Sequence, residues 1–353
     1  MLLTPFLQLI VERRASDLFV SGGAVPQIRL EGRTRAVGKR ELTPEEVERV
    51  AQELMGPAER RRFEQDWEVD FACRIEGLGR FRVNVFRQRG EVALVLRFVH
   101  PQAPEIRKLG LPLILQDLAL AGQGLVLMAG PTGCGKSTTL AAMVNHRNQH
   151  LTGHILTIED PIEFFHHNQR SIVNQRELGV DTRSYRNALR SALRESPDVV
   201  MIGEVRDRET MEAAIELAGT GHLTLATIHA NNAPQALDRI ANLFPNEAHK
   251  QLFMDLSLYL NAIISQRLVV SRGDESRLAA VEVMLNTPYI ADLISKGQFD
   301  KLKAAMEDSK TRGMQDMDTV LYQLYLEERI TLDEALSHAD SRPNLEAKIN
   351  FSG

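Results

Sequence analysis

The spacing of apolar and polar residues divides the chain near residue 100. In the first part, apolar and polar residues alternate over short runs, which is typical of half-buried strands. Two helical segments interrupt this pattern. Apolar residues recur at helical spacing over residues 2–11, and the capping box TPEE at residues 43–46 begins a second helix, which is expected to stop at the Gly-Pro pair of residues 56–57. We therefore predict that residues 1–100 form a small α+β domain with a mostly antiparallel sheet.

One predicted hairpin of this domain carries its arginines on a single face. Polar and apolar residues alternate over residues 80–85 and again over the return strand, residues 91–98. Arg80, Arg82 and Arg97 are therefore expected to share one polar face. The alternation alone favours a solvated basic face. The alternative is that these arginines reach the phosphates of a nucleotide held elsewhere.

The pattern changes after residues 101–112, a proline-containing stretch that is predicted to be an inter-domain linker. Short, wholly apolar runs then alternate with helical segments, and such runs are typical of parallel strands that are buried on both faces. The predicted strands are residues 125–129, 155–158, 199–202 and 223–228, and helices are predicted at residues 183–195 and 207–218. Residues 113–353 are thus expected to form an α/β domain, with a helical tail from about residue 285.

A phosphate-binding loop follows the first of these strands. The residues fit the pattern G-x-x-x-x-G-K-[ST] at every fixed position and lie between a predicted strand and a predicted helix. The predicted nucleotide-binding residues are Gly130, Pro131, Thr132, Gly133, Cys134, Gly135, Lys136, Ser137 and Thr138. Glycines allow such a loop to point its N–H groups at one anion, and the helix N-terminus adds partial positive charge. Lys136 is expected to reach the β and γ phosphates of ATP, and Ser137 to ligate Mg²⁺.

Acidic residues occur where two other predicted strands end. Glu159, Asp160, Glu163 and Glu204 are all candidates for a carboxylate that orients or deprotonates the attacking water. The carboxyl ends of parallel strands meet at one edge of a sheet, where the ligand binds. Gly203 occupies the position at which many phosphate-loop enzymes have a metal-binding Asp, so the acidic group is displaced to Glu204.

Two histidines flank the fourth predicted strand. His222 precedes residues 223–228 and His229 follows them. A lone histidine is more often an ordinary core or surface residue, but this pair makes a sensor of the γ-phosphate a reasonable hypothesis. The histidines and cysteines of the chain do not have the spacing of a zinc site.

The composition limits the class of protein. The chain has 353 residues and a net charge of −5, which gives no electrostatic footprint for nucleic acid. Its two cysteines, Cys73 and Cys134, fit a reducing cytoplasm. No apolar run approaches the ~20 residues of a membrane helix, and the N-terminus lacks the features of a signal peptide. We expect a soluble cytoplasmic protein that inserts into no membrane and binds no nucleic acid.

Four segments together resemble the motifs of the secretion ATPases of the type II and type IV pilus superfamily. The phosphate loop is the first. The sequence ILTIEDPIEF at residues 155–164 resembles the aspartate box, and SPDVVMIGEVRD at residues 196–207 resembles the atypical Walker B motif. Residues 220–233, from TGHL to HANNA, resemble the histidine box. The order and the spacing of the motifs match as well.

The resemblance covers nearly the whole chain. The sequence ASDL at residues 15–18 resembles the opening of the family's PAS-like N-terminal domain. The lack of a tetracysteine insert and the short N-terminus resemble the retraction branch, PilT and PilU. Residues 171–182 and 285–288 are similar to PilU in particular. PilT-type motors carry an AIRNLIRE-like helix where this chain has YIADLISK at residues 289–296, which favours a PilU-type accessory motor.

The resemblance implies roles that the spacing leaves open. Glu163 is implied as the general base, Glu204 as the Walker B acid near Mg²⁺, and His229 as a monitor of the γ-phosphate. The implied catalytic set is Glu163, Glu204, Lys136, His229, His222, Arg82 and Arg97, and the implied metal ligands are Ser137 and Glu204. Arg82 and Arg97 match arginines of the family's N-terminal domain that reach the nucleotide when that domain closes. The resemblance therefore reverses the interpretation of the hairpin as a solvated face.

The implied architecture is a RecA-like ATPase domain preceded by a PAS-like domain, assembled as a homohexameric ring. In such rings the N-terminal domain of one subunit packs on the ATPase domain of its neighbour. The implied function is ATP-driven retraction of type IV pili at the cytoplasmic face of the inner membrane. The implied partners are a PilT-type ATPase and the inner-membrane pilus platform protein.

Three alternatives stay open. The chain could be a pilus assembly or type II secretion ATPase, although the tetracysteine module expected for these is missing. It could be a nucleotide-binding subunit that acts through the ring of a PilT-type motor. It could also be a DNA-translocating motor, against which the excess of acidic residues in the predicted ATPase domain weighs.

Overall fold

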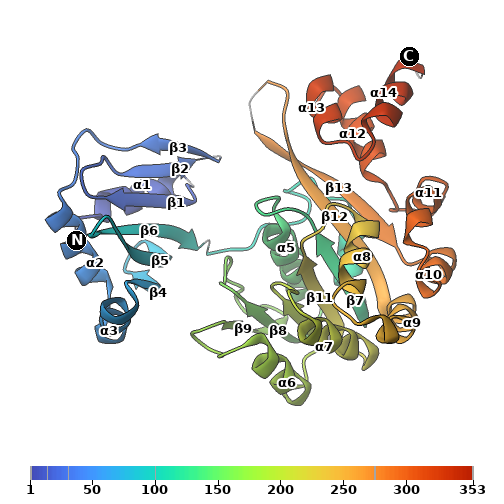
Figure 1. The fold of residues 1–353 in the computed structure, drawn as a ribbon, viewed down its shortest axis with the longest axis horizontal. Coiled ribbons are helices and arrows are strands. Elements are labelled where there is room, and N and C mark those ends of the chain that lie inside the picture. Colours follow the sequence, from blue (N-terminus) through green and yellow to red (C-terminus); the bar gives the residue numbers. More distant parts are fainter. Residues whose placement is uncertain (1, 14, 31, 100, 274–275, 352–353) are drawn as a thin grey trace. The chain divides into compact units, whose positions relative to one another are not determined.

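The computed structural model describes residues 2–13, 15–30, 32–99, 101–273 and 276–351. It divides the chain into two compact units, Met1–Pro101 and Gln102–Gly353. The first unit contains a six-stranded antiparallel sheet of order β3-β2-β1-β6-β5-β4 (Figure 1). Its strands are β1 (Asp17–Ser21), β2 (Gln27–Leu30), β3 (Arg33–Ala36), β4 (Glu68–Ile75), β5 (Gly79–Gln88) and β6 (Glu91–Val99). Its helices are α1 (Thr4–Arg13), α2 (Pro44–Leu54) and α3 (Pro57–Asp66).

Local sequence signals explain most of the first unit. The capping box of α2 is present, because Thr43 accepts from the backbone of Glu46 while the Glu46 carboxylate accepts from the backbone of Thr43. The predicted α+β class and antiparallel sheet are confirmed. A further helix, α3, which no pattern predicted, begins directly after α2. Gly56 is the N-cap residue of α3. Phe63 is the only buried residue of this helix, so its sequence has no apolar periodicity from which the helix could be predicted.

The second unit is built on a seven-stranded sheet of order β13-β12-β7-β11-β10-β8-β9 (Figure 1). The strands are parallel except for the antiparallel edge strand β13. They are β7 (Gly124–Ala129), β8 (Gly153–Glu159), β9 (Ser171–Glu177), β10 (Val199–Ile202), β11 (Leu223–Ile228), β12 (Leu260–Val270) and β13 (Arg277–Leu285). The four strands predicted from apolar runs are β7, β8, β10 and β11, so the predicted α/β class is confirmed.

Helices cover both faces of this sheet. The helices are α4 (Ile114–Ala119), α5 (Lys136–His150), α6 (Tyr185–Glu195), α7 (Arg208–Gly219), α8 (Ala233–Ala241), α9 (His249–Tyr259), α10 (Pro288–Ser295), α11 (Leu302–Glu307), α12 (Met317–Leu326), α13 (Leu332–Ser337) and α14 (Arg342–Phe351). Leu125 and Leu127 of β7 pack in the core with α6–α10, whereas Val126 and Met128 pack in the core with α4 and α5. The strand β7 is therefore buried on both sides, which accounts for its continuous apolar sequence.

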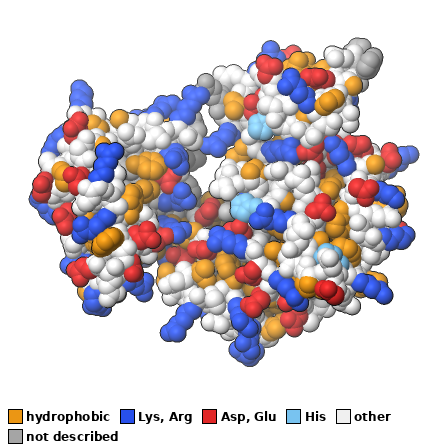
Figure 2. All heavy atoms as spheres, viewed as in Figure 1, with side chains coloured by type: hydrophobic (Ala, Val, Ile, Leu, Met, Phe, Trp, Pro, Cys, Tyr) orange, Lys and Arg blue, Asp and Glu red, His pale blue; other side chains and the backbone are white. Residues whose placement is uncertain are grey.

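The last helices form a separate small core on the edge of the sheet. Met317 and Leu321 of α12 pack against Val269 of β12 and Ala280 of β13. Acidic and basic side chains are interspersed over the face of the second unit seen in Figure 2. Among the described residues, no helix has both the length and the apolar content to cross a bilayer.

Candidate active site

The phosphate loop connects the carboxyl end of β7 to the amino end of α5. Gly133 and Gly135 have φ of 80° and 90°, in the left-handed region that glycine adopts without steric cost. Gly130 is required for a different reason, because a Cβ there would lie 2.4 Å from the Cys134 Sγ and 2.7 Å from the Gln266 carbonyl oxygen. The glycines of the motif therefore set both the curvature of the loop and its close contact with the neighbouring strand.

Lys136 is held inside the loop. Its Nζ donates to the carbonyl oxygens of Gly130 and Pro131, each at 2.8 Å. Burial lowers the pKa of this ammonium, and the negative charges of Glu204 and Glu163 act in the opposite direction. The lysine thus lies where the phosphates of a nucleotide are expected, within the electrostatic range of both predicted carboxylates.

A residue that the motif does not contain clamps the loop. Gln266 of β12 is buried; its Nε2 donates to the Cys134 carbonyl at 2.7 Å, and its Oε1 accepts from the Thr139 hydroxyl at 2.7 Å. One side-chain amide therefore fixes both the loop and the first turn of α5. The β12 strand lies beside β7 in parallel register, with Ser265 opposite Ala129, and this register places Gln266 next to the loop.

The carboxyl ends of β10 and β11 bring Glu204 and His229 together. His229 Nε2 lies 3.0 Å from Glu204 Oε1, and Arg206 Nε donates to Glu204 Oε2 at 2.8 Å. Hydrogen bonding with Glu204 also raises the pKa of Arg206. The Glu204 carboxylate is thus oriented from both sides at the edge where the sequence predicted the site.

The structure gives a steric reason for glycine at position 203. A Cβ on Gly203 would lie 3.0 Å from the Tyr185 hydroxyl and 3.2 Å from both the Glu159 Cα and the Ile158 carbonyl oxygen. A side chain at this position would push on β8 and α6, so an Asp cannot be placed here without a shift in its neighbours. The acidic group one residue later, Glu204, avoids this crowding.

The other candidate acids differ in their surroundings. Glu159 is buried and accepts from the Thr157 hydroxyl at 2.6 Å and from the Gln175 amide at 3.1 Å. Burial raises the pKa of Glu159 to about 7. The Oδ2 atom of Asp160 lies 3.7 Å from the Nη1 atom of Arg206. Burial is the largest cause of the pKa shifts of Lys136 and Glu159, and the negative charge of Glu163 acts to raise the pKa of both groups.

The structure does not bring His222 to the phosphate loop. His222 precedes β11, at the amino end of the strand, where its Nδ1 lies 3.1 Å from the Leu217 carbonyl oxygen. His229 follows the carboxyl end of the same six-residue strand. At about 3.3 Å per residue, the two histidines are separated by roughly 20 Å. Residues that flank one strand lie at its opposite ends. The phosphate loop lies at the carboxyl ends of the strands, where His229 is, and not at the amino ends.

Arg82 and Arg97 belong to the first unit. They are direct cross-strand partners of β5 and β6, so the predicted sharing of one face by these two arginines is confirmed. Arg82 Nε donates to both carboxylate oxygens of Asp70 at 2.9 Å, and Arg97 Nε donates to Asp17 Oδ1 at 2.8 Å. These carboxylates offset the repulsion between two like charges in opposed positions.

Two cavities adjoin the phosphate loop. One, of about 540 Å³, is lined by loop residues 131–134 and by polar residues of β12, β13, α8 and the segment after α13, including Arg267, Arg277 and Asp340. The other, of about 500 Å³, is lined by Pro131, by His229 and by the face of α8. Ligand sites in proteins commonly have volumes of about 300–1,000 Å³, so the loop opens onto space of the size that a nucleotide needs.

Comparisons with known proteins show the family of the chain. The model of the type II/IV secretion system protein family matches residues 1–319. The type IV pilus ATPase PilU of Pseudomonas aeruginosa is 50% identical over 345 residues, which are 98% of this chain and 90% of the relative. The chain belongs to the PilT/PilU branch of the type II/IV secretion ATPases.

Two further relatives in this branch support the assignment. The type IV pilus retraction ATPase PilT of Pseudomonas aeruginosa is 38% identical over 337 residues, 96% of this chain and 98% of the relative. A crystal structure of the pilus retraction motor PilT with bound ADP superimposes with a TM-score of 0.90 at 41% identity, covering 97% of this chain and 98% of that one. An N-terminal domain followed by a RecA-like ATPase domain is therefore the architecture of this secretion ATPase.

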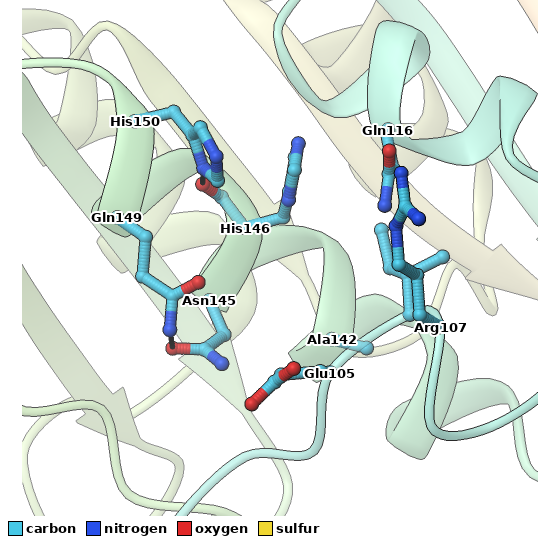
Figure 3. Close-up of a pocket in the computed structure, with 9 residues that line it drawn as sticks. Glu105, Arg107, Gln116, Ala142, Asn145, His146, Gln149 and His150 are labelled. Atoms are coloured by element: carbon cyan, nitrogen blue, oxygen red, sulfur yellow. Dashed lines mark hydrogen bonds between the residues drawn. The ribbon is translucent and has the colours of Figure 1, made fainter.

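A further cavity in the ATPase domain is remote from the loop. It has a volume of about 210 Å³ and lies beside the last turns of α5, where the rings of His146 and His150 are 4.0 Å apart (Figure 3). Ten residues separate Lys136 from His146, and at 1.5 Å per residue this corresponds to about 15 Å. The cavity is thus not part of the phosphate site in this secretion ATPase.

Several residues of the site escaped prediction. Two of them, Gln266 and Arg267, lie outside the four motifs. The third, Arg206, lies within the segment that resembles the Walker B motif, but no spacing signal gave it a role. The polar run Ser265-Gln266-Arg267 within an otherwise apolar segment is the one sequence signal that could have found β12 as a strand facing the site.

Proposed function

We propose that this chain is a Mg²⁺-dependent ATPase motor that powers retraction of type IV pili as a hexamer, in the manner of a PilU-type accessory motor. The observation that carries the proposal is the 50% identity to PilU over 98% of the chain. The retention of Lys136, Glu163 and Glu204 around the loop argues for turnover rather than for a site that only binds nucleotide. The expected location is the cytoplasmic side of the pilus base, beside an inner-membrane platform protein and a PilT-type ATPase.

The residues fit Mg²⁺ with its usual ligands. The described residues contain no cluster of three His, Cys, Asp or Glu side chains that could hold a metal alone. Mg²⁺ is commonly held by one or two protein groups together with phosphate oxygens, so Ser137 and Glu204 are a sufficient protein contribution. When bound, the ion neutralises charge on the phosphates.

The proposed roles of the protein groups are supported by their contacts. Lys136 is proposed to contact the β and γ phosphates by exchanging the carbonyls of Gly130 and Pro131 for phosphate oxygens. Glu163 is the proposed base for the attacking water. His229 is proposed to respond to the γ-phosphate, and the 3.0 Å distance between its Nε2 and Glu204 Oε1 supports this role.

Arg82 and Arg97 are proposed to complete the site when an N-terminal domain closes on the nucleotide. Their present carboxylate partners, Asp70 and Asp17, would then compete with the phosphates for the same guanidinium groups. ATP can drive this closure only if it binds the closed arrangement better than the open one.

Phosphate release by the purified chain tests the enzymatic part. We expect Mg²⁺-dependent turnover in the wild type, and we expect losses of at least about 100-fold in Lys136→Ala, Glu163→Gln and Glu204→Ala. Wild-type turnover in both glutamate variants would refute the site assignment. Arg35→Ala, on the exposed strand β3, is a matched control for Arg82→Ala and Arg97→Ala.

Retraction in cells tests the motor part. Deletion of this gene with and without a PilT-type partner, followed by measurement of pilus retraction, distinguishes an accessory motor from an independent one. Loss of piliation on deletion, rather than loss of retraction, would instead support an assembly ATPase.

A further inference from the structure

An ion pair joins the loop that carries His229 to the C-terminal helices. Arg267 of β12 pairs with Asp340, which follows α13, and the two side chains are only 13% and 9% exposed. Arg267 also donates to the carbonyl oxygen of His338 and, at 3.1 Å, to that of Asn231. One guanidinium therefore holds two segments that lie more than a hundred residues apart in the sequence.

Asp340 is itself fixed on the opposite side. Its Oδ2 accepts from the Asn232 amide at 3.3 Å, and its backbone N–H donates to Asp318 Oδ1 at 2.7 Å. Asp318 belongs to α12 and is paired with Lys303 of α11 at 2.7 Å. The network thus runs without interruption from residues 231–232 to two C-terminal helices.

The segment of residues 231–233 is also held by the sheet, at the end where α8 begins. The backbone N–H of Ala233, the first residue of α8, donates to the buried Glu282 of β13 at 2.8 Å. Asn232 caps α8 by accepting from the backbone of Gln235 at 3.0 Å. His229 lies two residues before Asn231, so its position opposite Glu204 depends on how this short segment is fixed.

We propose that Arg267 and Asp340 are positioning residues that hold residues 229–233, here termed the histidine loop, in the geometry that places His229 on Glu204. The C-terminal helices are thereby part of the nucleotide site, although they carry none of its motifs. This proposal rests on the proposed function and specifies a further element of the same site. Both residues line the cavity of about 540 Å³ beside the phosphate loop, so the network lies at the position where nucleotide binding would reach it.

Single and double substitutions test the proposal. Because a misplacement of about 1 Å can cost about 100-fold in rate, we expect Asp340→Asn and Arg267→Gln each to lower kcat by at least about tenfold, with KM changed by less than about threefold. The double variant pairs two neutral amide groups, and we expect it to be no slower than the slower single variant, which is the signature of residues acting as one unit. Glu346→Gln on α14, which removes an exposed ion pair with Arg342, is the matched control and should turn over as the wild type does.

Other outcomes have definite meanings. If Arg267→Gln raises KM while Asp340→Asn leaves both constants unchanged, then Arg267 contacts the nucleotide directly and the proposal is wrong. Additive losses in the double variant would likewise overturn it.

A second measurement does not depend on turnover. Amide hydrogen exchange of the histidine loop should be faster in Asp340→Asn than in the wild type, with exchange in β7 and β10 unchanged. Unaltered exchange in the loop contradicts the proposal even if the variant is folded and active. Absence of phosphate release from the wild type would instead contradict the proposed function and leave the exchange experiment valid.

Discussion

Gln266 offers the sharpest test of how the phosphate loop is organised. Replacement of Gln266 by Met keeps a side chain of similar volume but removes the donor to the Cys134 carbonyl and the acceptor of the Thr139 hydroxyl. Each hydrogen bond contributes about 1 kcal/mol net, and a buried polar group left without a partner costs about 1–3 kcal/mol. The expected loss is therefore about 2–4 kcal/mol.

Much of this loss should fall on the loop that binds phosphate. Because 1.4 kcal/mol corresponds to a tenfold change in an equilibrium constant, we expect Gln266→Met to weaken ADP binding at least about tenfold. Titration calorimetry with ADP measures the effect, and a melting curve of the variant shows whether the fold is retained. Thr139→Val removes only the hydroxyl and should weaken binding by a smaller factor.

The two substitutions together give a double-mutant cycle. The bond between Gln266 and Thr139 is lost in each single variant, so the double variant should bind ADP better than the sum of the two losses predicts, by about 1 kcal/mol. Strict additivity, or an ADP affinity within twofold of the wild type in Gln266→Met, would refute the reasoning that this amide holds the loop.

Three further predictions concern single positions. Thr224 is buried in the central strand β11, and its hydroxyl has no hydrogen-bond partner among the described residues, so Thr224→Val should stabilise the fold by about 1 kcal/mol and raise the melting temperature. Gly203→Ala should cost about 1–3 kcal/mol because its Cβ would lie 3.0 Å from the Tyr185 hydroxyl, and phosphate release should fall as Glu204 is displaced; an unchanged melting temperature would contradict this. Burial raises the pKa of Glu159 from 4.5 to about 7, so the folded state retains a proton between these pH values that the unfolded state releases, and stability attributable to this group declines as pH rises through that window. Glu159→Gln should therefore melt like the wild type near pH 5 and gain about 3 kcal/mol on it by pH 8, and a constant difference across this range would contradict the assignment.

The sequence predicted those parts of the fold and of the site that depend on residues close together in the chain. The phosphate loop, the capping box of α2 and the four apolar strands each depend on residues close in sequence. The placement of Glu204 at the edge of the sheet follows from the parallel arrangement of those strands. The same rule separates the two histidines, because His229 follows the carboxyl end of β11, whereas His222 precedes its amino end.

The strand β12 illustrates why the rest was hidden. Its apolar residues at 262–264 and 268–270 are interrupted by Ser265, Gln266 and Arg267, which breaks the continuous pattern expected of a buried parallel strand. These polar residues are the ones that contact the site. A strand that supplies side chains to a cleft thus loses the continuous apolar pattern of a buried parallel strand, and the polar run is the signal that remains.

Adjacent residues of β12 act on different halves of the cleft. Gln266 fixes the phosphate loop, and Arg267 fixes the histidine loop together with Asp340. Successive side chains of a strand point to opposite faces, so one residue step suffices to serve both loops. The register of β12 against β7, with Ser265 opposite Ala129, therefore determines the distance between the group that binds phosphate and the group that contacts Glu204. A shift of β12 relative to β7 would therefore change both contacts at once.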